Sequence, residues 1–162
     1  MTPLRKTVVL FGVTAAIPVV ALVGAATFTH DDASGSPDHT VRDFLVSTVA
    51  ERDGFDACTY VTRRALAELH AVERPGMICE AELGSYARLT LGGETIDTEA
   101  AVKALDYRDE RESGGRIRVT VCAHGDGRTF VLRRATRRER DEFAAPLTPW
   151  RVDAGVNGLV AR

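Results

Sequence analysis

Three cysteines have the most definite chemistry in this sequence: Cys58, Cys79 and Cys122. Cys58 and Cys79 each fall on the apolar face of a predicted helical segment, and a disulfide between them would tie those segments together. The pairings Cys58–Cys122 and Cys79–Cys122 stay open, and an unpaired Cys122 would be a buried thiol, a link between two chains or a reactive group. Neither the cysteine spacing nor the scattered histidines match a zinc pattern, so we expect no metal site.

Acid–base catalysis would need ionisable side chains that meet in a pocket, with a donor for a developing oxyanion. No pair in this sequence forms a recognisable catalytic arrangement, so we expect no catalytic residue and no cofactor. Tyr60 and Tyr86 are better explained as amphipathic core residues, and with Trp150 they are the candidates for lining a pocket. Asp153 alternates with Trp150 and Val152 along a predicted strand and is expected to face solvent. The candidates by residue type are Tyr60, Tyr86, Tyr107, Asp97, Asp106 and Asp153.

A run of arginines occupies residues 133–140 (RRATRRER). It could meet anionic lipid head groups or an acidic partner. Because Glu139, Asp141 and Glu142 interrupt or follow it, a solvated strand end and loop is the favoured interpretation. Residues 106–112 (DYRDERE) have the same mixed charge and predict an exposed hairpin end.

Residues 7–28 form an uncharged, mostly apolar run directly after Arg5 and Lys6. As a helix this run would span roughly 33 Å, enough for the core of a bilayer. It is either a signal peptide cleaved after Ala25 or an uncleaved signal anchor, which its length favours. The positive flank stays in the cytoplasm, so the C-terminal part is expected outside the cell membrane, tethered or, after cleavage, secreted. Disulfide formation is the default for cysteines in that compartment.

The polar residues 29–37 predict a linker, and residues 38–162 are enough for one domain with a single core. The chain of 162 residues has a net charge of −2, so its composition does not indicate nucleic-acid binding.

Capping signals and helical periodicity predict three helices, of which the first two begin at the hydroxyl caps Thr40 and Thr62. Thr40 and Asp43 fit a capping box. The helices are expected to end at Asp53-Gly54, Pro75-Gly76 and Gly92-Gly93, with a short helical turn at 55–60 and the third helix at 78–89.

Alternating apolar residues then predict strands. The strongest are 117–122 and 129–134, joined by a turn at 124–127, and 149–154, in which Trp150 and Val152 share a face. Residues 100–107 are expected to form a preceding strand. Helices followed by a meander of about four strands predict an α+β fold.

This arrangement resembles the nuclear-transport-factor-2-like (NTF2-like) superfamily over residues 38–155. The resemblance rests on VRDFLVSTVAERDGFDACTYV at 41–61, on Cys58 and Cys79, and on the closing PWRVDAG at 149–155. It implies a cone of three helices on a curved antiparallel sheet, often with a disulfide between helices, and a homodimer formed through the outer face of the sheet. The layout is similar to that of small exported actinobacterial members and of Mce-associated membrane proteins of actinobacterial lipid importers.

The apolar run and the resemblance together predict a membrane-tethered extracytoplasmic domain of the cell envelope. It would bind a protein partner or a small apolar ligand, without catalysis. The alternatives are a small pocket enzyme of the ketosteroid-isomerase or polyketide-cyclase type, and a secreted antigen-like domain. Titratable side chains converging in an apolar pocket would favour the enzyme, whereas a pocket filled by Leu and Phe side chains would count against it.

Overall fold

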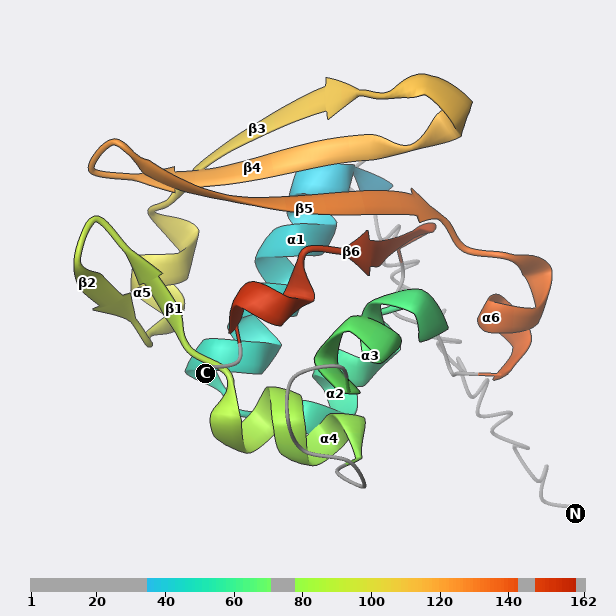
Figure 1. Ribbon diagram of the computed structural model, residues 1–162, viewed down its shortest axis with the longest axis horizontal. Helices are drawn as coiled ribbons and strands as arrows, with labels where there is room; N and C mark the ends of the chain where they lie inside the picture. Colours follow the sequence, from blue (N-terminus) through green and yellow to red (C-terminus); the bar gives the residue numbers. More distant parts are fainter. Residues whose placement is uncertain (1–34, 71–77, 143–147, 160–162) are drawn as a thin grey trace, which may run out of the picture.

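The computed structural model describes residues 35–70, 78–142 and 148–159. In these ranges the chain forms a four-stranded antiparallel sheet with helices against one face, which is the α+β arrangement predicted from the sequence (Figure 1). The apolar run at 7–28 and nearly all of the predicted linker lie outside the described residues. Within the described ranges, no helix is long and apolar enough to cross a bilayer.

Helix α1 (Pro37–Leu45) continues directly into the π-helical turn η2 (Val46–Ala50). It begins one turn earlier than the capping box at Thr40 predicted, because Ser36 is the N-cap and Pro37 follows it. Proline suits the first helical position, where its fixed φ is already helical and its missing N–H costs nothing. Thr40 instead lies inside the helix, and its hydroxyl donates to the Ser36 carbonyl oxygen at 3.0 Å.

Three helices follow: α2 (Gly54–Thr59), α3 (Arg63–His70) and α4 (Cys79–Ala81), which runs into the π-helical turn η3 (Glu82–Tyr86). The predicted cap of the second helix is confirmed, because Thr62 Oγ1 accepts a hydrogen bond from the Ala65 N–H at 3.3 Å. The predicted helical turn at 55–60 corresponds to α2. The helix predicted at 78–89 ends earlier, at Tyr86.

Two expectations between residues 89 and 105 are wrong. Gly92 and Gly93 do not stop a helix: they form the turn between β1 (Leu89–Leu91) and β2 (Glu94–Ile96), with φ values of 59° and 82°. Positive φ at both central positions matches the twist of a tight hairpin, and glycine adopts it without strain. The strand predicted at 100–107 begins instead as helix α5 (Glu99–Lys103), because Thr98 Oγ1 caps it by accepting the Ala101 N–H at 3.2 Å.

The main sheet is a meander of β3 (Asp106–Arg111), β4 (Ile117–Ala123), β5 (Asp126–Arg134) and β6 (Trp150–Ala154), in which each strand pairs with the next. This confirms the three strands predicted at 117–122, 129–134 and 149–154. The β4–β5 turn has left-handed φ values at His124 (51°) and Gly125 (83°). Residues 106–112 are not a hairpin end but mostly strand β3, whose charged side chains suit a sheet edge because they discourage pairing with another chain.

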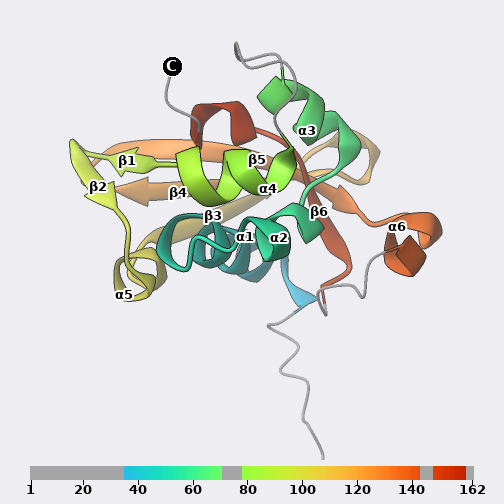
Figure 2. The same cartoon turned by 90° about the horizontal axis from the view of Figure 1, so that it is seen from below.

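One face of this sheet packs on the helices. Figure 2 shows α1, α2 and α4 lying across the sheet, with the long strands behind them. Strand β4 alternates between buried and more exposed residues, and its buried side chains meet the apolar face of α1 in a single hydrophobic cluster. The largest apolar contributors, all at 0% or 1% exposure, are Phe44, Leu45, Leu69, Leu83, Leu89, Leu91, Phe130, Leu132 and Leu159.

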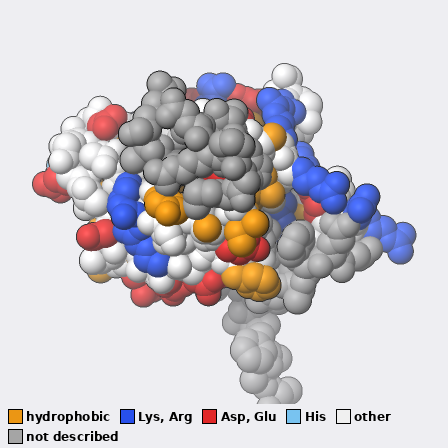
Figure 3. Space-filling model, turned by 60° about the horizontal axis from the view of Figure 1, so that its bottom comes forward, with side chains coloured by type: hydrophobic (Ala, Val, Ile, Leu, Met, Phe, Trp, Pro, Cys, Tyr) orange, Lys and Arg blue, Asp and Glu red, His pale blue; other side chains and the backbone are white. Residues whose placement is uncertain are grey.

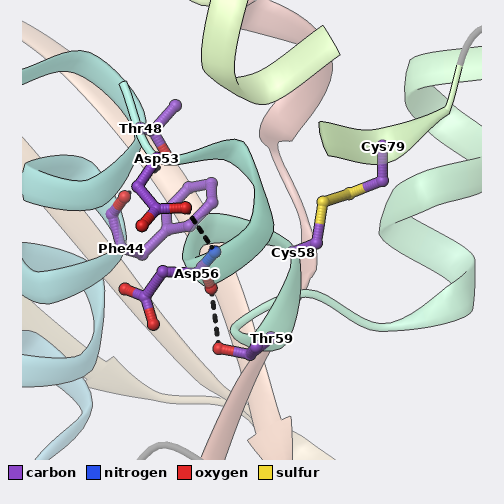
Figure 4. The surroundings of a disulfide bond; sticks show 7 residues. All are labelled: Phe44, Thr48, Asp53, Asp56, Cys58, Thr59 and Cys79. Carbon is purple, nitrogen blue, oxygen red and sulfur yellow. Dashed lines mark hydrogen bonds between the residues drawn. A yellow bond between two sulfur atoms is a disulfide. The ribbon is translucent and has the colours of Figure 1, made fainter. Parts of the chain in front are cut away.

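A disulfide joins α2 to α4. Cys58 and Cys79 are bonded, with their Cα atoms 6.1 Å apart, which confirms this pairing among the three that the sequence allows (Figure 4). Cys122 is a free, half-buried thiol. The two helices approach closely at Gly54, where an added Cβ would lie 1.9 Å from the carbonyl oxygen of Glu80. Figure 4 also shows the Asp53 carboxylate accepting the Asp56 N–H, at 3.0 Å, which caps α2 beside the disulfide.

Candidate functional site

The three predicted pocket-lining residues lie in different environments and do not converge. Tyr60 is buried in the core, with its ring centre 6.5 Å from that of Phe44. Tyr86, at the end of η3, is 41% exposed. Trp150 is buried at the start of β6, and its ring lines an open cleft at the end of the sheet.

Among the described residues, the space between the helices and the sheet is filled by side chains. Phe44 of α1 packs edge-on against Phe130 of β5, with ring centres 6.1 Å apart and both side chains at 0% exposure. Burial, helped by the nearby Asp56 charge, raises the pKa of Tyr60, which therefore stays a neutral phenol. This interior resembles a packed core more than a binding chamber.

The other candidates by residue type have structural partners or are exposed. The Tyr107 hydroxyl donates to the Val102 carbonyl oxygen at 2.9 Å, and the Arg42 guanidinium lies 4.9 Å from its ring centre. Burial raises the pKa of Tyr107 to about 12. Asp97 is exposed, as is Asp106, which forms an ion pair with its strand neighbour Arg108.

Asp153 is almost fully buried, so its predicted solvent-facing position is wrong. Its side chain is 4% exposed. Its Oδ1 accepts hydrogen bonds from Thr62 Oγ1 at 2.9 Å and from Arg133 Nε at 3.2 Å, and its Oδ2 lies 3.6 Å from Arg64 Nη1 and 3.5 Å from Arg116 Nη2. Helix α3 packs against β6, and arginines from neighbouring strands cover what remains. The alternation of residues along β6 could not predict the burial of Asp153, because the side chains that cover it come from α3 and from other strands.

An open cleft of about 620 Å³ lies beside this network, at the end of the sheet. The 3₁₀ turn η4 (Ser113–Gly115) joins β3 to β4 there, and the strand register brings the ends of β3 and β5 next to the starts of β4 and β6. We call this hollow the arginine cleft. Its charged and aromatic lining residues are Arg111, Glu112, Arg116, Arg133, Arg134 and Trp150.

The arginine cleft carries an excess of positive charge. Glu112 is already paired with Arg118, so it does not neutralise the lining arginines. In the described part of the chain, Arg111 and Arg134 have no carboxylate within ion-pair distance. The Arg134 guanidinium instead lies 5.0 Å from the centre of the Trp150 ring, a cation–π contact that holds it over the aromatic wall.

Arg133, in contrast, has most of its donors engaged. Its Nη1 and Nη2 donate to the two oxygens of Glu139 at 2.8 and 2.6 Å, while its Nε binds Asp153. Glu139 also accepts the Thr136 N–H at 2.8 Å, and Thr136 Oγ1 accepts the Glu139 N–H at 3.3 Å, a capping box that starts α6 (Arg137–Glu142). The hydrogen bonds from Arg133 hold the pKa of Glu139 at about 2. Arg133 thus anchors the cleft wall: with a further bond from Nη1 to the Arg134 carbonyl oxygen, four of its five N–H donors are engaged and only one is left for a ligand.

A further positive charge is buried in β6, directly after Trp150. Arg151 is 1% exposed and donates from Nη1 to the carbonyl oxygens of Thr148 and Trp150, at 3.0 and 2.7 Å. Its Nη2 has no hydrogen-bond partner among the described residues, and burial lowers the pKa of Arg151. A buried cation without a paired carboxylate strengthens the positive potential at this end of β6.

A second open cleft, of about 450 Å³, lies at the opposite end of the sheet. Cys122 and His124 both line it. Two of its lining residues, Arg108 and Asp106 of β3, form an ion pair with each other. His124 Nε2 lies 3.6 Å from a carboxylate oxygen of Glu94. No bond that the structure describes links the Cys122 thiol to a base, so this cleft offers no activated nucleophile.

Among the residues that the structure describes, large exposed hydrophobic side chains are few. Figure 3 shows them in small separate groups on the lower face, and basic side chains gathered along the side on which α6 lies in Figure 1. The large ones among the described residues are Phe55 at 71%, Ile78 at 64% and Tyr86 at 41% exposure.

Sequence reasoning treated Arg111, Arg133 and Arg134 as surface residues and missed Arg116. The signal for Arg116, Arg133 and Arg134 was positional, because they directly precede or end a predicted strand and antiparallel pairing brings such ends together. Arg111 lies beyond the strand predicted at 100–107, so this signal did not mark it. Trp150, which opens the last strand, marks the same edge.

No protein-family model matches this chain, and no curated protein or solved structure matches it either. Fold alone would not define an activity in any case, because one fold hosts many functions. Function must therefore be inferred from the arginine cleft and its surroundings.

Proposed function

We propose that this chain is a membrane-tethered, extracytoplasmic binding domain of NTF2-like fold that takes an anionic group of its partner in the arginine cleft, without catalysis. The observation that carries the proposal is the pair Arg111 and Arg134, which line the cleft and have no described carboxylate partner. Guanidinium groups bind phosphate and carboxylate through paired charge-assisted hydrogen bonds.

The disulfide supports the extracytoplasmic location. Bonds such as Cys58–Cys79 form and persist in oxidising compartments and are rare in the cytosol. The apolar run at 7–28, with Arg5 and Lys6 before it, supports export with the domain on the far side of the membrane. Helices packed on one face of an antiparallel meander are also what an NTF2-like cone requires.

The packing supports binding over catalysis. The filled interior leaves little room for the apolar substrate chamber of an isomerase-like enzyme, or for a small apolar ligand. Asp153, the most buried carboxylate of the candidates, has both oxygens engaged by Thr62 and three arginines, so it is placed to hold the arginines and not to move a proton. With an apolar ligand and catalysis disfavoured, the binding partner that fits best is one that brings a negatively charged group to the cleft.

Trp150 provides a direct test, because it is the only tryptophan in the chain and lies in the cleft wall. The full chain in neutral detergent micelles would be titrated with inorganic phosphate while Trp150 emission is followed. We expect a saturable change, weakened about tenfold in Arg111→Gln, since a hydrogen bond to a charged group is worth about 1.5–3 kcal/mol.

The matched control is Arg108→Gln, which removes the same charge from the other end of β3, outside the arginine cleft. It should titrate like the wild type. An unchanged emission in the wild type, or equal affinities in wild type and Arg111→Gln, would contradict the proposed anion site.

A further inference from the structure

The arginine cleft lies where the chain enters the folded domain. Gly35 is the first described residue, and its carbonyl oxygen accepts the indole N–H of Trp150 at 2.9 Å. One turn into α1, the hydroxyl of Thr40 is hydrogen-bonded to that of Thr148. These two bonds fasten the start of the domain to the wall of the cleft.

The distance from the cleft to the membrane is bounded by the length of chain between them. The apolar run ends at Phe28, seven residues before Gly35, and a fully extended chain covers at most about 3.3–3.6 Å per residue. If the run spans the bilayer, Gly35 and the Trp150 ring beside it lie within about 25 Å of its surface. Because this tether is short, the effective concentration of lipid head groups at the cleft is high.

The charge of the cleft is complementary to an anionic surface. Arg111 and Arg134 face the cleft, whereas α6 carries Arg137, Arg138 and Arg140 together with Glu139, Asp141 and Glu142, so the excess of positive charge lies in the cleft itself. Each basic residue near an anionic bilayer strengthens attachment by about fivefold. Trp150, which is buried under the Arg134 guanidinium, forms the wall of the cleft behind these arginines.

We propose that the arginine cleft docks onto the anionic phospholipid head groups of the membrane that holds the domain's own tether. This inference rests on the proposed function and names the partner of the same site. Arg111 and Arg134 bind lipid phosphates, which brings the Trp150 wall of the cleft close to the head-group layer. The domain is thereby held with its cleft end against the membrane and the β1–β2 end of the molecule away from it.

The test uses the full chain reconstituted into vesicles of phosphatidylcholine alone, or of three parts phosphatidylcholine to one part phosphatidylglycerol. Trp150 emission reports docking through quenching by lipids brominated near the head group and through shielding from acrylamide, a neutral quencher. We expect both effects in the anionic vesicles only. They should vanish when NaCl rises from about 0.1 M to about 1 M, since the Debye length falls from about 10 Å to about 3 Å.

Three variants sharpen the result. Arg111→Gln should weaken the docked state about fivefold. Arg111→Lys should weaken it less, because lysine keeps the charge but loses the paired hydrogen bonds of the guanidinium group, and the distant Arg108→Gln should leave docking close to that of the wild type. Circular dichroism of each variant checks that the fold is kept.

Two outcomes would overturn the inference. If anionic and neutral vesicles give the same Trp150 quenching while inorganic phosphate still changes the emission in neutral vesicles, the cleft binds a free or partner-borne anion and not the bilayer. If neither anionic lipid nor phosphate affects Trp150, both the lipid inference and the proposed anion-binding function fail.

Discussion

Replacing Asp153 by Asn should destabilise the fold by about 2–3 kcal/mol, although the change alters a single charge. Two hydrogen bonds to the Asp153 carboxylate, from Thr62 and Arg133, are buried, and bonds to a charged group are worth about 1.5–3 kcal/mol each. The pairs with Arg64 and Arg116 add little, because those arginine side chains are 57% and 42% exposed and solvent screens them. Asparagine keeps one acceptor oxygen, so part of the hydrogen-bond energy is retained. Its NH2 group, however, would place N–H donors against the N–H donors of the guanidinium groups.

The assay is urea unfolding of the full chain in neutral detergent, followed by Trp150 emission. With a denaturant slope of about 1–3 kcal/mol per molar, the midpoint should fall by about 1 M. Glu110→Gln is the control: it makes the same charge change at an exposed position of β3 for which no ion pair is described, and should stay within about 0.5 kcal/mol of the wild type. A similarly small effect of Asp153→Asn would refute the structural role and return Asp153 to the solvent-facing position predicted from the sequence.

The disulfide, the Arg133–Glu139 pair and the α2–α4 contact yield three further predictions. Reducing the disulfide, or replacing Cys58 by Ala, should lower the free energy of unfolding by about 3 kcal/mol for a loop of this length, while Cys122→Ala should leave the effect of reductant unchanged; equal unfolding midpoints with and without reductant would exclude the bond. Because Arg133 lowers the pKa of Glu139 from 4.5 to about 2, their pairing should stabilise the fold fully above pH 4.5 and progressively less as the pH falls toward 2. Glu139→Gln should flatten that part of the plot of urea midpoint against pH, and a wild-type slope in the variant would contradict the pairing. Gly54→Ala should prevent native packing of α2 on α4, because the new Cβ meets a backbone oxygen at 1.9 Å; a variant with the wild-type thermal midpoint would show that the helices are farther apart.

The elements predicted correctly from the sequence are those determined by neighbouring residues. Strands β4 and β5 alternate apolar and polar residues around a tight turn, and Thr62 starts α3 with a local hydrogen bond. The disulfide also followed from local reasoning, because the apolar run suggested an oxidising compartment and the two cysteines lay on helical apolar faces.

The elements predicted wrongly depend on partners distant in the sequence. Strand β3 has the charged sequence DYRDER and becomes a strand only through pairing with β4. The Gly92-Gly93 turn is stabilised by the short strands on either side of it, which are too brief for a clear period. Asp153 is buried because α3 covers β6, a contact between segments some ninety residues apart. The arginine cleft could not be predicted for the same reason, since its residues meet only when four strand ends are in register.

The location of the domain is the claim on which both proposals depend, and thiol labelling of the full chain in intact cells tests it most directly. A membrane-impermeant maleimide would be applied with and without an impermeant reductant, and the labelled cysteines identified by mass spectrometry. A domain outside the membrane should show Cys58 and Cys79 protected before reduction and both labelled after it, without lysis of the cells. Free thiols at both positions, reached by the maleimide only after lysis, would contradict the extracytoplasmic location and with it the tethered binding domain.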